Sequence, residues 1–337
     1  MSNLNKLLIA NRGEIAIRIT RAAQELGLTA VAIYPEDDAQ SLHVRLADEA
    51  VLLEGRGASA YLDIAQIVQL AKDAGCDGVH PGYGFLSENA NFAAAVEAAN
   101  MTFIGPSVAA LDAFGDKAKA RALAQACDVP VVAGLSEAIS IEQAQAFFAA
   151  HADSGILLKA IAGGGGRGMR IVRSADELVD AFTRCQSEAL AAFGNDGLYA
   201  EQLVASPRHI EVQIIGDGSG AVSHIWEREC SLQRRHQKLV EIAPSPTLDP
   251  AIRDAMCAAA VRLGQEINYA GLGTIEFLLD TNANEFFFIE ANARLQVEHT
   301  VTEEVTGIDL VRAQIEVAGG ASLNDLGLQQ AGVPDPR

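Results

Sequence analysis

The chain has 337 residues, of which 49% are hydrophobic and 20% charged, and its formal net charge is −19. This length predicts about two or three domains, and the acidic balance disfavours nucleic-acid binding, which needs a basic surface. No segment approaches the ~20 apolar residues of a membrane helix, and the N-terminus lacks the features of a signal peptide. We therefore expect a cytoplasmic protein that binds neither membranes nor nucleic acid.

The first third of the chain alternates short apolar strands with helices. A strand is expected at residues 6–10, followed by a helix over about 14–26 that Gly27 closes. Further strands are expected at 29–35, 49–53, 76–82 and 101–106, with helices over 61–75 and after Ser87. Alternation of this kind predicts a parallel, doubly wound sheet for roughly residues 1–110.

The middle of the chain has a different pattern of expected helices and strands. A helix is expected over about 117–127, and strand-like runs at 156–160 and 169–172 flank the glycine-rich stretch AGGGGRG. The region to about residue 204 is therefore predicted to be a small α+β unit with a glycine loop between two strands.

The last part of the chain is rich in strands. Residues 209–215 and 221–227 flank a Gly-Asp-Gly-Ser-Gly turn and predict a hairpin. A helix over about 250–267 precedes a second antiparallel hairpin, formed by 273–280 and 285–292. The tail after Gly319 is linker-like.

The glycine run matches GxGxxG from Gly163 to Gly168, but the expected strand after it argues against a dinucleotide site, which needs a helix there. A Walker A loop is excluded because no Gly-Lys-Ser/Thr follows. Glycines let backbone N–H groups approach phosphate oxygens, and Lys159 precedes the run as a potential phosphate contact. For the glycines alone, a flexible surface turn remains an equal alternative.

A second motif, IEANARLQVEH, places a polar residue at every second position. In extended backbone these residues share one face: Glu290, Asn292, Arg294, Gln296 and Glu298. Together with Glu276 on the neighbouring hairpin strand, Glu290 and Asn292 offer hard oxygen ligands for Mg²⁺. The alternative is an edge strand whose polar face is solvated. The apolar flanks predict instead that Glu276 and Glu290 are buried, and a buried carboxylate usually pairs or binds a metal.

A third motif, QRRHQK, concentrates positive charge in an acidic chain and favours an anion site over a solvated basic stretch. His236 and Lys238 would share a face if this segment is extended. No base is apparent for Cys230, so a packing role is expected, and His80 and His299 are interpreted as structural. The five cysteines form no CxxC pair, which argues against a zinc site and a disulfide framework.

At these motifs the sequence resembles the biotin carboxylase family. The matching stretches are IANRGEIA (residues 9–16), HPGYGFLSEN (80–89), GGGGRGM (163–169), ERECSLQRRHQKLVE (227–241) and IEANARLQVEH (289–299). The resemblance implies an α/β and α+β protein in which an N-terminal doubly wound parallel sheet precedes an ATP-grasp domain with a glycine-rich lid. It divides the chain into a Rossmann-like domain at 1–115, an ATP-grasp linker and lid at 116–204, and an incomplete C-terminal part at 205–337.

The resemblance also implies roles for individual residues. The ATP-binding residues would be Lys117, Lys159, Gly163, Gly164, Gly165, Gly166, Glu201, Gln202, Leu203, Val204, His209, Gln233, His236, Glu276 and Glu290. Magnesium (or manganese) would be held by Glu276, Glu290 and Asn292. The bicarbonate-binding residues would be Lys238, Arg294, Gln296, Val297 and Glu298, of which Lys238, Arg294 and Glu298 would be catalytic, with Glu298 as the base.

The implied reaction is ATP-dependent carboxylation of biotin by bicarbonate through carboxyphosphate. Biotin would come from a carrier domain or chain, with a carboxyltransferase as further partner and a homodimer for the full-length form. The family continues beyond residue 337, so we expect a fragment that binds ATP but carboxylates biotin weakly. Two alternatives stay open: another bicarbonate-activating ATP-grasp ligase, such as a carbamoyl-phosphate synthetase-like enzyme, and a catalytically incomplete nucleotide-binding fragment.

Overall fold

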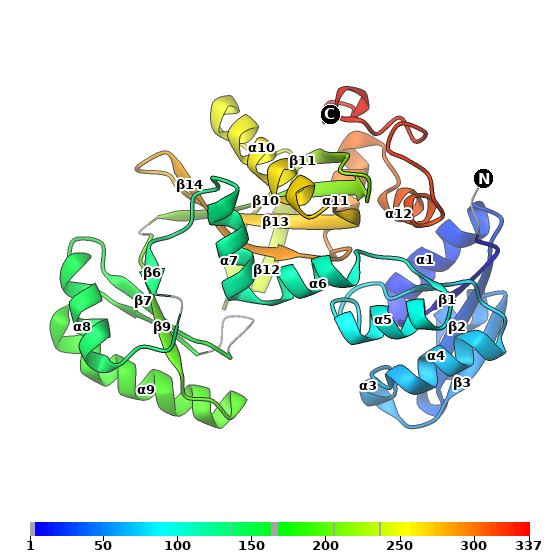
Figure 1. The fold of residues 1–337 in the computed structure, drawn as a ribbon, viewed down its shortest axis with the longest axis horizontal. Helices are drawn as coiled ribbons and strands as arrows, with labels where there is room; N and C mark the ends of the chain where they lie inside the picture. The colour runs from blue at the N-terminus through cyan, green and yellow to red at the C-terminus, as the bar shows by residue number, and fades with distance from the viewer. Residues whose placement is uncertain (1–3, 136, 163–167, 205, 236) are drawn as a thin grey trace.

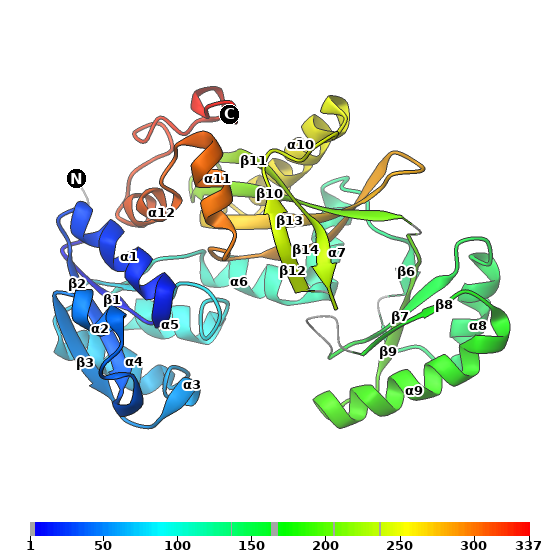
Figure 2. The same cartoon turned by 180° about the vertical axis from the view of Figure 1, so that it is seen from behind.

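The structure is a computed structural model that describes residues 4–135, 137–162, 168–204, 206–235 and 237–337. Its strands form three sheets, and the two views of the ribbon show the N-terminal sheet and the sheet that contains β7 at opposite ends of the molecule, with the β10–β14 sheet between them (Figures 1 and 2). Within these residues, no helix combines the length and the apolar character needed to cross a membrane.

The N-terminal sheet is parallel throughout, with strand order β3-β2-β1-β4-β5. Its strands are β1 (Lys6–Ile9), β2 (Thr29–Pro35), β3 (Glu49–Leu53), β4 (Gly78–His80) and β5 (Thr102–Phe103). Its helices are α1 (Gly13–Glu25), α2 (Leu42–Leu46), α3 (Gly57–Ala60), α4 (Ile64–Asp73) and α5 (Ala90–Ala98), with a 3-10 turn at Glu36–Asp38. The predicted doubly wound sheet is confirmed. After Lys6, the central strand β1 is apolar and buried, as expected where helices cover both faces of the sheet.

A second, four-stranded sheet has the order β6-β9-β7-β8. It contains β6 (Gly134–Leu135), β7 (Ile156–Ala160), β8 (Met169–Val172) and β9 (Leu198–Gln202), and it packs against α8 (Ile141–Ala150) and α9 (Ala175–Phe193). We call these elements the lid unit. Strands β7 and β8 pair antiparallel, as predicted for the two sides of the glycine-rich stretch. Residues 163–167 of that stretch lie outside the described residues.

The third sheet, here the central sheet, is antiparallel with the order β12-β11-β10-β13-β14. Its strands are β10 (Pro207–Asp217), β11 (Val222–Arg234), β12 (Gln237–Ile242), β13 (Ala270–Asp280) and β14 (Glu285–Asn292). The helices around it are α6 (Val108–Gly115), α7 (Lys117–Ala126), α10 (Pro250–Glu266), α11 (His299–Thr306) and α12 (Leu310–Ala318), with a 3-10 turn at Gln330–Gly332. Both predicted hairpins are present.

Two expectations about the C-terminal part were wrong. Strand β14 ends at Asn292 as predicted, but residues 293–298 form a loop into α11 and not the extended backbone assumed for the polar alternation. The loop is fixed by burial of Leu295 and by side-chain hydrogen bonds in place of a strand ladder. The tail is also not a free linker, because Leu323 is buried and Trp226 donates its indole N–H to the carbonyl of Pro334 over 2.7 Å.

The apolar cores are divided unequally among the three sheets. Two clusters of buried side chains each join the N-terminal sheet to the central sheet, for example through Leu8 and Ile275 in one and Leu7 and Leu272 in the other. The lid unit has a separate core that includes Leu158 and Leu178. The lid unit is thus packed as a body of its own, on the far side of the central sheet from the N-terminal unit.

Candidate active site

A cavity of about 1700 Å³ lies between the lid unit and the central sheet. Every described residue that the sequence assigned to the site lines this cavity: Lys117, Lys159, Glu201, Gln202, Leu203, Val204, His209, Gln233, Lys238, Glu276, Glu290, Asn292, Arg294, Gln296, Val297 and Glu298. The remaining assigned residues, Gly163 to Gly166 and His236, lie outside the described residues. The fold therefore brings together side chains from the QRRHQK and IEANARLQVEH motifs, from β7 and from α7.

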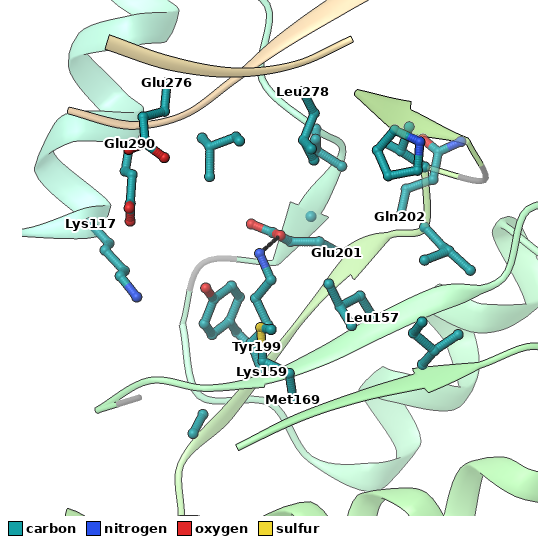
Figure 3. Close-up of a pocket in the computed structure, with 18 of the residues that line it drawn as sticks. Lys117, Leu157, Lys159, Met169, Tyr199, Glu201, Gln202, Glu276, Leu278 and Glu290 are labelled. Carbon is teal, nitrogen blue, oxygen red and sulfur yellow. Dashed lines mark hydrogen bonds and ion pairs between the residues drawn. The ribbon is translucent and has the colours of Figure 1, made fainter. Parts of the chain in front are cut away.

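The lid side of the cavity combines an apolar wall with an ion pair. Figure 3 shows Leu157, Met169, Tyr199 and Leu278 around the same space into which Lys159 projects. The Lys159 ammonium donates to the Glu201 carboxylate. An apolar slot beside a cation suits a planar heterocycle that carries phosphates. The apolar members were not predicted from the sequence, although Leu157 lies two residues from Lys159 on β7, and this period-two spacing could have identified it.

Across the cavity, Glu276 and Glu290 face each other from paired strands. They are register partners on β13 and β14, and a bulge beside them pairs Phe277 with Phe288. Their side chains point to the same part of the cavity, next to Lys117 (Figure 3). As predicted, Glu276 is buried, with 4% of its surface exposed, whereas Glu290 is only half-buried.

The electrostatics of this carboxylate pair fit a divalent cation. Burial raises the pKa of Glu276, but hydrogen bonds and charge from His209 and Lys238 outweigh it, so the net pKa is lowered. Burial and the negative charge of Glu276 raise the pKa of Glu290. Two facing carboxylates, one of them destabilised as an anion by the other, form a hard-oxygen donor set whose repulsion a divalent cation would relieve.

Asn292 forms hydrogen bonds with both Glu276 and Arg294 at this end of the cavity. Its side-chain nitrogen donates to Glu276 Oε1 over 2.9 Å, and its oxygen accepts from Arg294 Nη2 over 2.9 Å. Arg294 also donates Nε–H to Glu88 of the N-terminal unit over 2.8 Å. Glu276, Asn292 and the guanidinium of Arg294 are therefore held in one hydrogen-bonded row.

Lys238 on β12 contacts carboxylates from three other segments of the chain. Its Nζ lies 2.5 Å from Glu211 Oε2, 2.6 Å from Glu298 Oε1 and 3.0 Å from Glu276 Oε1. Burial works against the charge of Lys238, but the carboxylates outweigh it and raise its pKa above the ordinary value. Glu211 was not predicted from the sequence, although it lies two residues after His209 and shares its face of β10.

The end of the cavity near Glu298 combines a base with donors. Burial alone would raise the pKa of Glu298. The charge and the hydrogen bond of Lys238 outweigh burial and bring the net pKa below its ordinary value, so this carboxylate is ionised near neutral pH. An ionised carboxylate can accept a proton, and Arg294, which lines the same cavity and is held by Glu88 and Asn292, supplies N–H donors. Val297 lines the same end with 61% of its surface exposed.

Three residues of reactive types near the site are buried and have structural roles. Burial lowers the pKa of His80 to about 3 and, together with the charge of Glu211, raises that of the Cys230 thiol. His299 is buried too, and its Nδ1 lies 2.8 Å from the carbonyl of Gln296. These features agree with the structural roles that the sequence analysis gave them.

Comparison with known families divides the chain into two matched stretches. Residues 3–111 match the model described as the N-terminal domain of biotin carboxylase. Residues 116–326 match the model described as the ATP-binding domain of the carbamoyl-phosphate synthase L chain.

Individual carboxylases are similar to this protein over nearly the whole chain. Mitochondrial pyruvate carboxylase from Rattus norvegicus is 52% identical over 334 residues, which are 98% of this chain and 28% of that protein. A biotin carboxylase from Campylobacter jejuni, solved in a complex with a β,γ-ATP ligand, superimposes with a TM-score of 0.92 at 43% identity, over 98% of this chain and 74% of that one.

The biotin carboxylase domain of 2-oxoglutarate carboxylase from Hydrogenobacter thermophilus was solved as a dimer with MgADP, ADP and bicarbonate. It superimposes with a TM-score of 0.91 at 43% identity, over 98% of this chain and 72% of that one.

Proposed function

The chain belongs to the biotin carboxylase family, and from this premise we propose that it carries the site for ATP-dependent carboxylation of biotin by bicarbonate. It spans 28% of the length of the pyruvate carboxylase to which it is similar. The biotin carboxylase of Campylobacter jejuni matches 98% of this chain and was solved with a β,γ-ATP ligand, which supports ATP as a substrate. The bicarbonate in the Hydrogenobacter domain supports bicarbonate as the second substrate.

One observation carries the proposal: Lys238 joins the two halves of the cavity. Its ammonium contacts both Glu276 of the carboxylate pair and Glu298, and all three side chains line the cavity. An ATP γ-phosphate near Glu276 and Glu290 would therefore lie next to an anion bound beside Glu298. Bicarbonate attack on that phosphate requires this adjacency, because two anions must meet in line.

Each charged group has a place in this reaction. Glu298 would take the proton of bicarbonate, and Arg294 would orient the resulting anion through its fixed guanidinium. Bicarbonate oxygen bonds to the γ-phosphorus while the bond to the bridging oxygen breaks, giving carboxyphosphate and ADP. Lys238 would stabilise the charge on the transferring phosphoryl group. Carboxyphosphate then supplies CO₂, and the phosphate that is released can take the ureido proton of biotin.

The nucleotide would occupy the space between the lid unit and the central sheet. Its base would lie among the apolar side chains that include Leu157 and Leu278, with the backbone of residues 201–204 beside it and its phosphates toward Lys117 and Lys159. Lys159 would exchange its contact with Glu201 for the phosphates. His209 and Gln233, which share a hydrogen bond, would contact ribose or phosphate oxygens.

Glu276 and Glu290 would hold magnesium, with Asn292 fixing Glu276 through its amide. When bound, the ion would neutralise phosphate charge. We further propose that biotin arrives on a carrier domain or protein and passes its carboxyl group to a carboxyltransferase, since the relatives are multidomain carboxylases much longer than this chain.

The test is ADP formation by the full-length protein that contains these residues, measured with and without bicarbonate and free biotin. We expect ADP formation to require bicarbonate and to be stimulated by biotin. Glu298→Gln should lower the bicarbonate-dependent rate about 100-fold or more, as loss of a general base does, while ATP binding changes less than about threefold. Glu304→Gln, at an exposed position on the helix that follows, is the matched control and should behave like the unmodified protein.

The outcomes separate the proposal from its alternatives. ADP formation that ignores biotin but responds to ammonia would instead indicate a carbamoyl-phosphate synthetase-like ligase. ATP binding with no bicarbonate-dependent turnover in the full-length protein would indicate a nucleotide-binding unit without catalysis.

A further inference from the structure

One fully buried arginine lies behind the cavity without lining it. Arg228 on β11 has no exposed surface, and its guanidinium makes five hydrogen bonds to side chains. Its Nε donates to Glu211 Oε1 over 2.5 Å, Nη1 donates to Gln213 and Thr302, and Nη2 donates to Thr274 and Gln296. An arginine side chain carries five N–H groups, so all of them are engaged.

The contact with Gln296 decides which way that amide faces. Arg228 can only donate, so the atom 3.0 Å from its Nη2 must be the amide oxygen of Gln296. The amide nitrogen then points to the other side, where it donates to Glu276 Oε1 over 3.1 Å. Because Gln296 lines the cavity and Arg228 does not, an anion there meets N–H donors and not a carbonyl oxygen.

Through its contact with Glu211, Arg228 also helps to position Lys238. One carboxylate oxygen of Glu211 accepts from Arg228, and the other lies 2.5 Å from Lys238 Nζ. Glu211 has no exposed surface, so without Arg228 it would be a buried anion balanced by Lys238 alone. The guanidinium thus fixes Glu211 in the position from which it holds Lys238 toward the cavity.

We propose that Arg228 is a positioning residue for the anion that binds beside Glu298: it fixes the amide of Gln296 as a donor toward the cavity. This inference rests on the proposed function, in which that anion is bicarbonate. Arg228 itself touches no substrate. Its action passes through Gln296, over 68 positions in the sequence, and through Glu211.

The test compares Arg228→Lys with Arg253→Lys in the full-length protein. Lysine keeps the charge but offers three donors without the planar fork, so the amide of Gln296 loses its fixed partner. We expect Arg228→Lys to raise KM for bicarbonate about tenfold while KM for ATP changes less than about threefold. Arg253 makes a comparable contact with buried Glu227 over 2.8 Å, away from the cavity lining, and its lysine variant should change neither constant by more than twofold.

A double-mutant comparison separates positioning from general damage to the fold. If Arg228 acts through Gln296, Arg228→Lys should add less than about twofold to KM for bicarbonate when Gln296→Ala is already present. Effects that multiply fully in the double variant would overturn the proposal, as would an unchanged KM in Arg228→Lys. Absence of bicarbonate-dependent turnover in the unmodified protein would instead refute the proposed function.

A further variant decides the question if Arg228→Lys does not fold. Gln296→Glu keeps an oxygen acceptor for Arg228 but presents an anionic oxygen to the cavity in place of N–H. The amide orientation set by Arg228 predicts a raised KM for bicarbonate in this variant with ATP binding retained. An unchanged KM for bicarbonate would contradict it.

Discussion

His209 and Glu276 share a contact whose strength depends on one proton. The Nε2 of His209 lies 2.7 Å from Glu276 Oε2. Burial lowers the pKa of His209, but the hydrogen bond and the charge of Glu276 outweigh it and raise the net value above 6.5. A histidine whose pKa is raised in the folded state stabilises that state fully below its unfolded pKa, and this contribution is lost as pH rises through the folded pKa.

We therefore predict that the free energy of unfolding of the ligand-free protein falls as pH rises above 6.5 through the folded pKa of His209. Each unit of elevation corresponds to about 1.4 kcal/mol. Glu276→Gln should bring the His209 pKa below 6.5 and remove this part of the pH dependence. The ring protons of His209 report the pKa by NMR, and urea unfolding at several pH values reports the stability. A pKa at or below 6.5 in the unmodified protein would contradict the prediction.

The charged residues of the site differ in how far the sequence could reveal them. Apolar flanking residues identified Glu276 and Glu290, because a buried carboxylate usually pairs or binds a ligand. Arg228 could not be recognised in this way. Its partner Gln296 lies 68 positions away, and only the packing of β10, β11, β13 and α11 shows that the guanidinium faces inward and not to solvent.

At the scale of elements, the last residue of the glycine-rich stretch, Gly168, packs closely against β7 and α9. Gly168 has a φ of +68°, and a Cβ there would lie 2.9 Å from the Cβ of Ala160 and 3.4 Å from a ring carbon of Phe193. Its carbonyl accepts from the backbone N–H of Ala160 over 2.8 Å and from the thiol of Cys185 over 3.3 Å. The point at which the stretch rejoins β8 is thus fixed against β7 and α9.

We predict that Gly168→Ala raises KM for ATP about fivefold or more, because both the clash and the left-handed backbone would displace the start of β8. Gly194→Ala is the matched control: its φ is +71°, but no atom lies within 4 Å of an added Cβ. It should carry only the backbone penalty of about 1–2 kcal/mol and leave KM for ATP within twofold. Initial rates and thermal unfolding of both variants test this, and equal effects on KM would refute a specific role for Gly168.

Most elements followed from local patterns, and the exceptions have physical causes. Apolar runs and turn residues were sufficient for the strands of the N-terminal sheet and for β10, β11, β13 and β14, whereas β12 of the central sheet was not predicted. The polar alternation through residues 290–298 was interpreted as extended backbone, yet the backbone leaves the strand after Asn292. Beyond that point Gln296 and Glu298 take hydrogen bonds from Arg228 and Lys238. Such long-range side-chain contacts leave no period in the local sequence, so the loop could not be predicted from it.

At the scale of the whole molecule, the division of the cores sets what can move. The N-terminal and central sheets share two apolar clusters, whereas the lid unit encloses its own. Local sequence patterns show that each strand is buried but not which sheets share a core, so this division emerged only from the structure. Since the cavity lies between the lid unit and the central sheet, a lid unit that opens separately would admit the nucleotide without disturbing Lys238 and its partners.

This division predicts that a cavity in the core of the lid unit destabilises fewer sheets than a cavity in a shared core does. Leu178 on α9 belongs to the core of the lid unit, and Leu263 on α10 belongs to a shared core; both side chains are buried. Truncation of either to alanine should cost about 2–5 kcal/mol. We expect Leu178→Ala to speed amide hydrogen exchange within residues 134–202 only, because opening the lid unit breaks no shared core.

Leu263→Ala should instead speed exchange in both the N-terminal and the central sheets, since they lose stability together. Hydrogen exchange followed by mass spectrometry of peptides from each sheet makes the comparison. Faster exchange in all three sheets after Leu178→Ala would show that the lid unit unfolds only with the rest of the chain. In that case the nucleotide would have to enter through a smaller displacement than the opening of a whole packed unit.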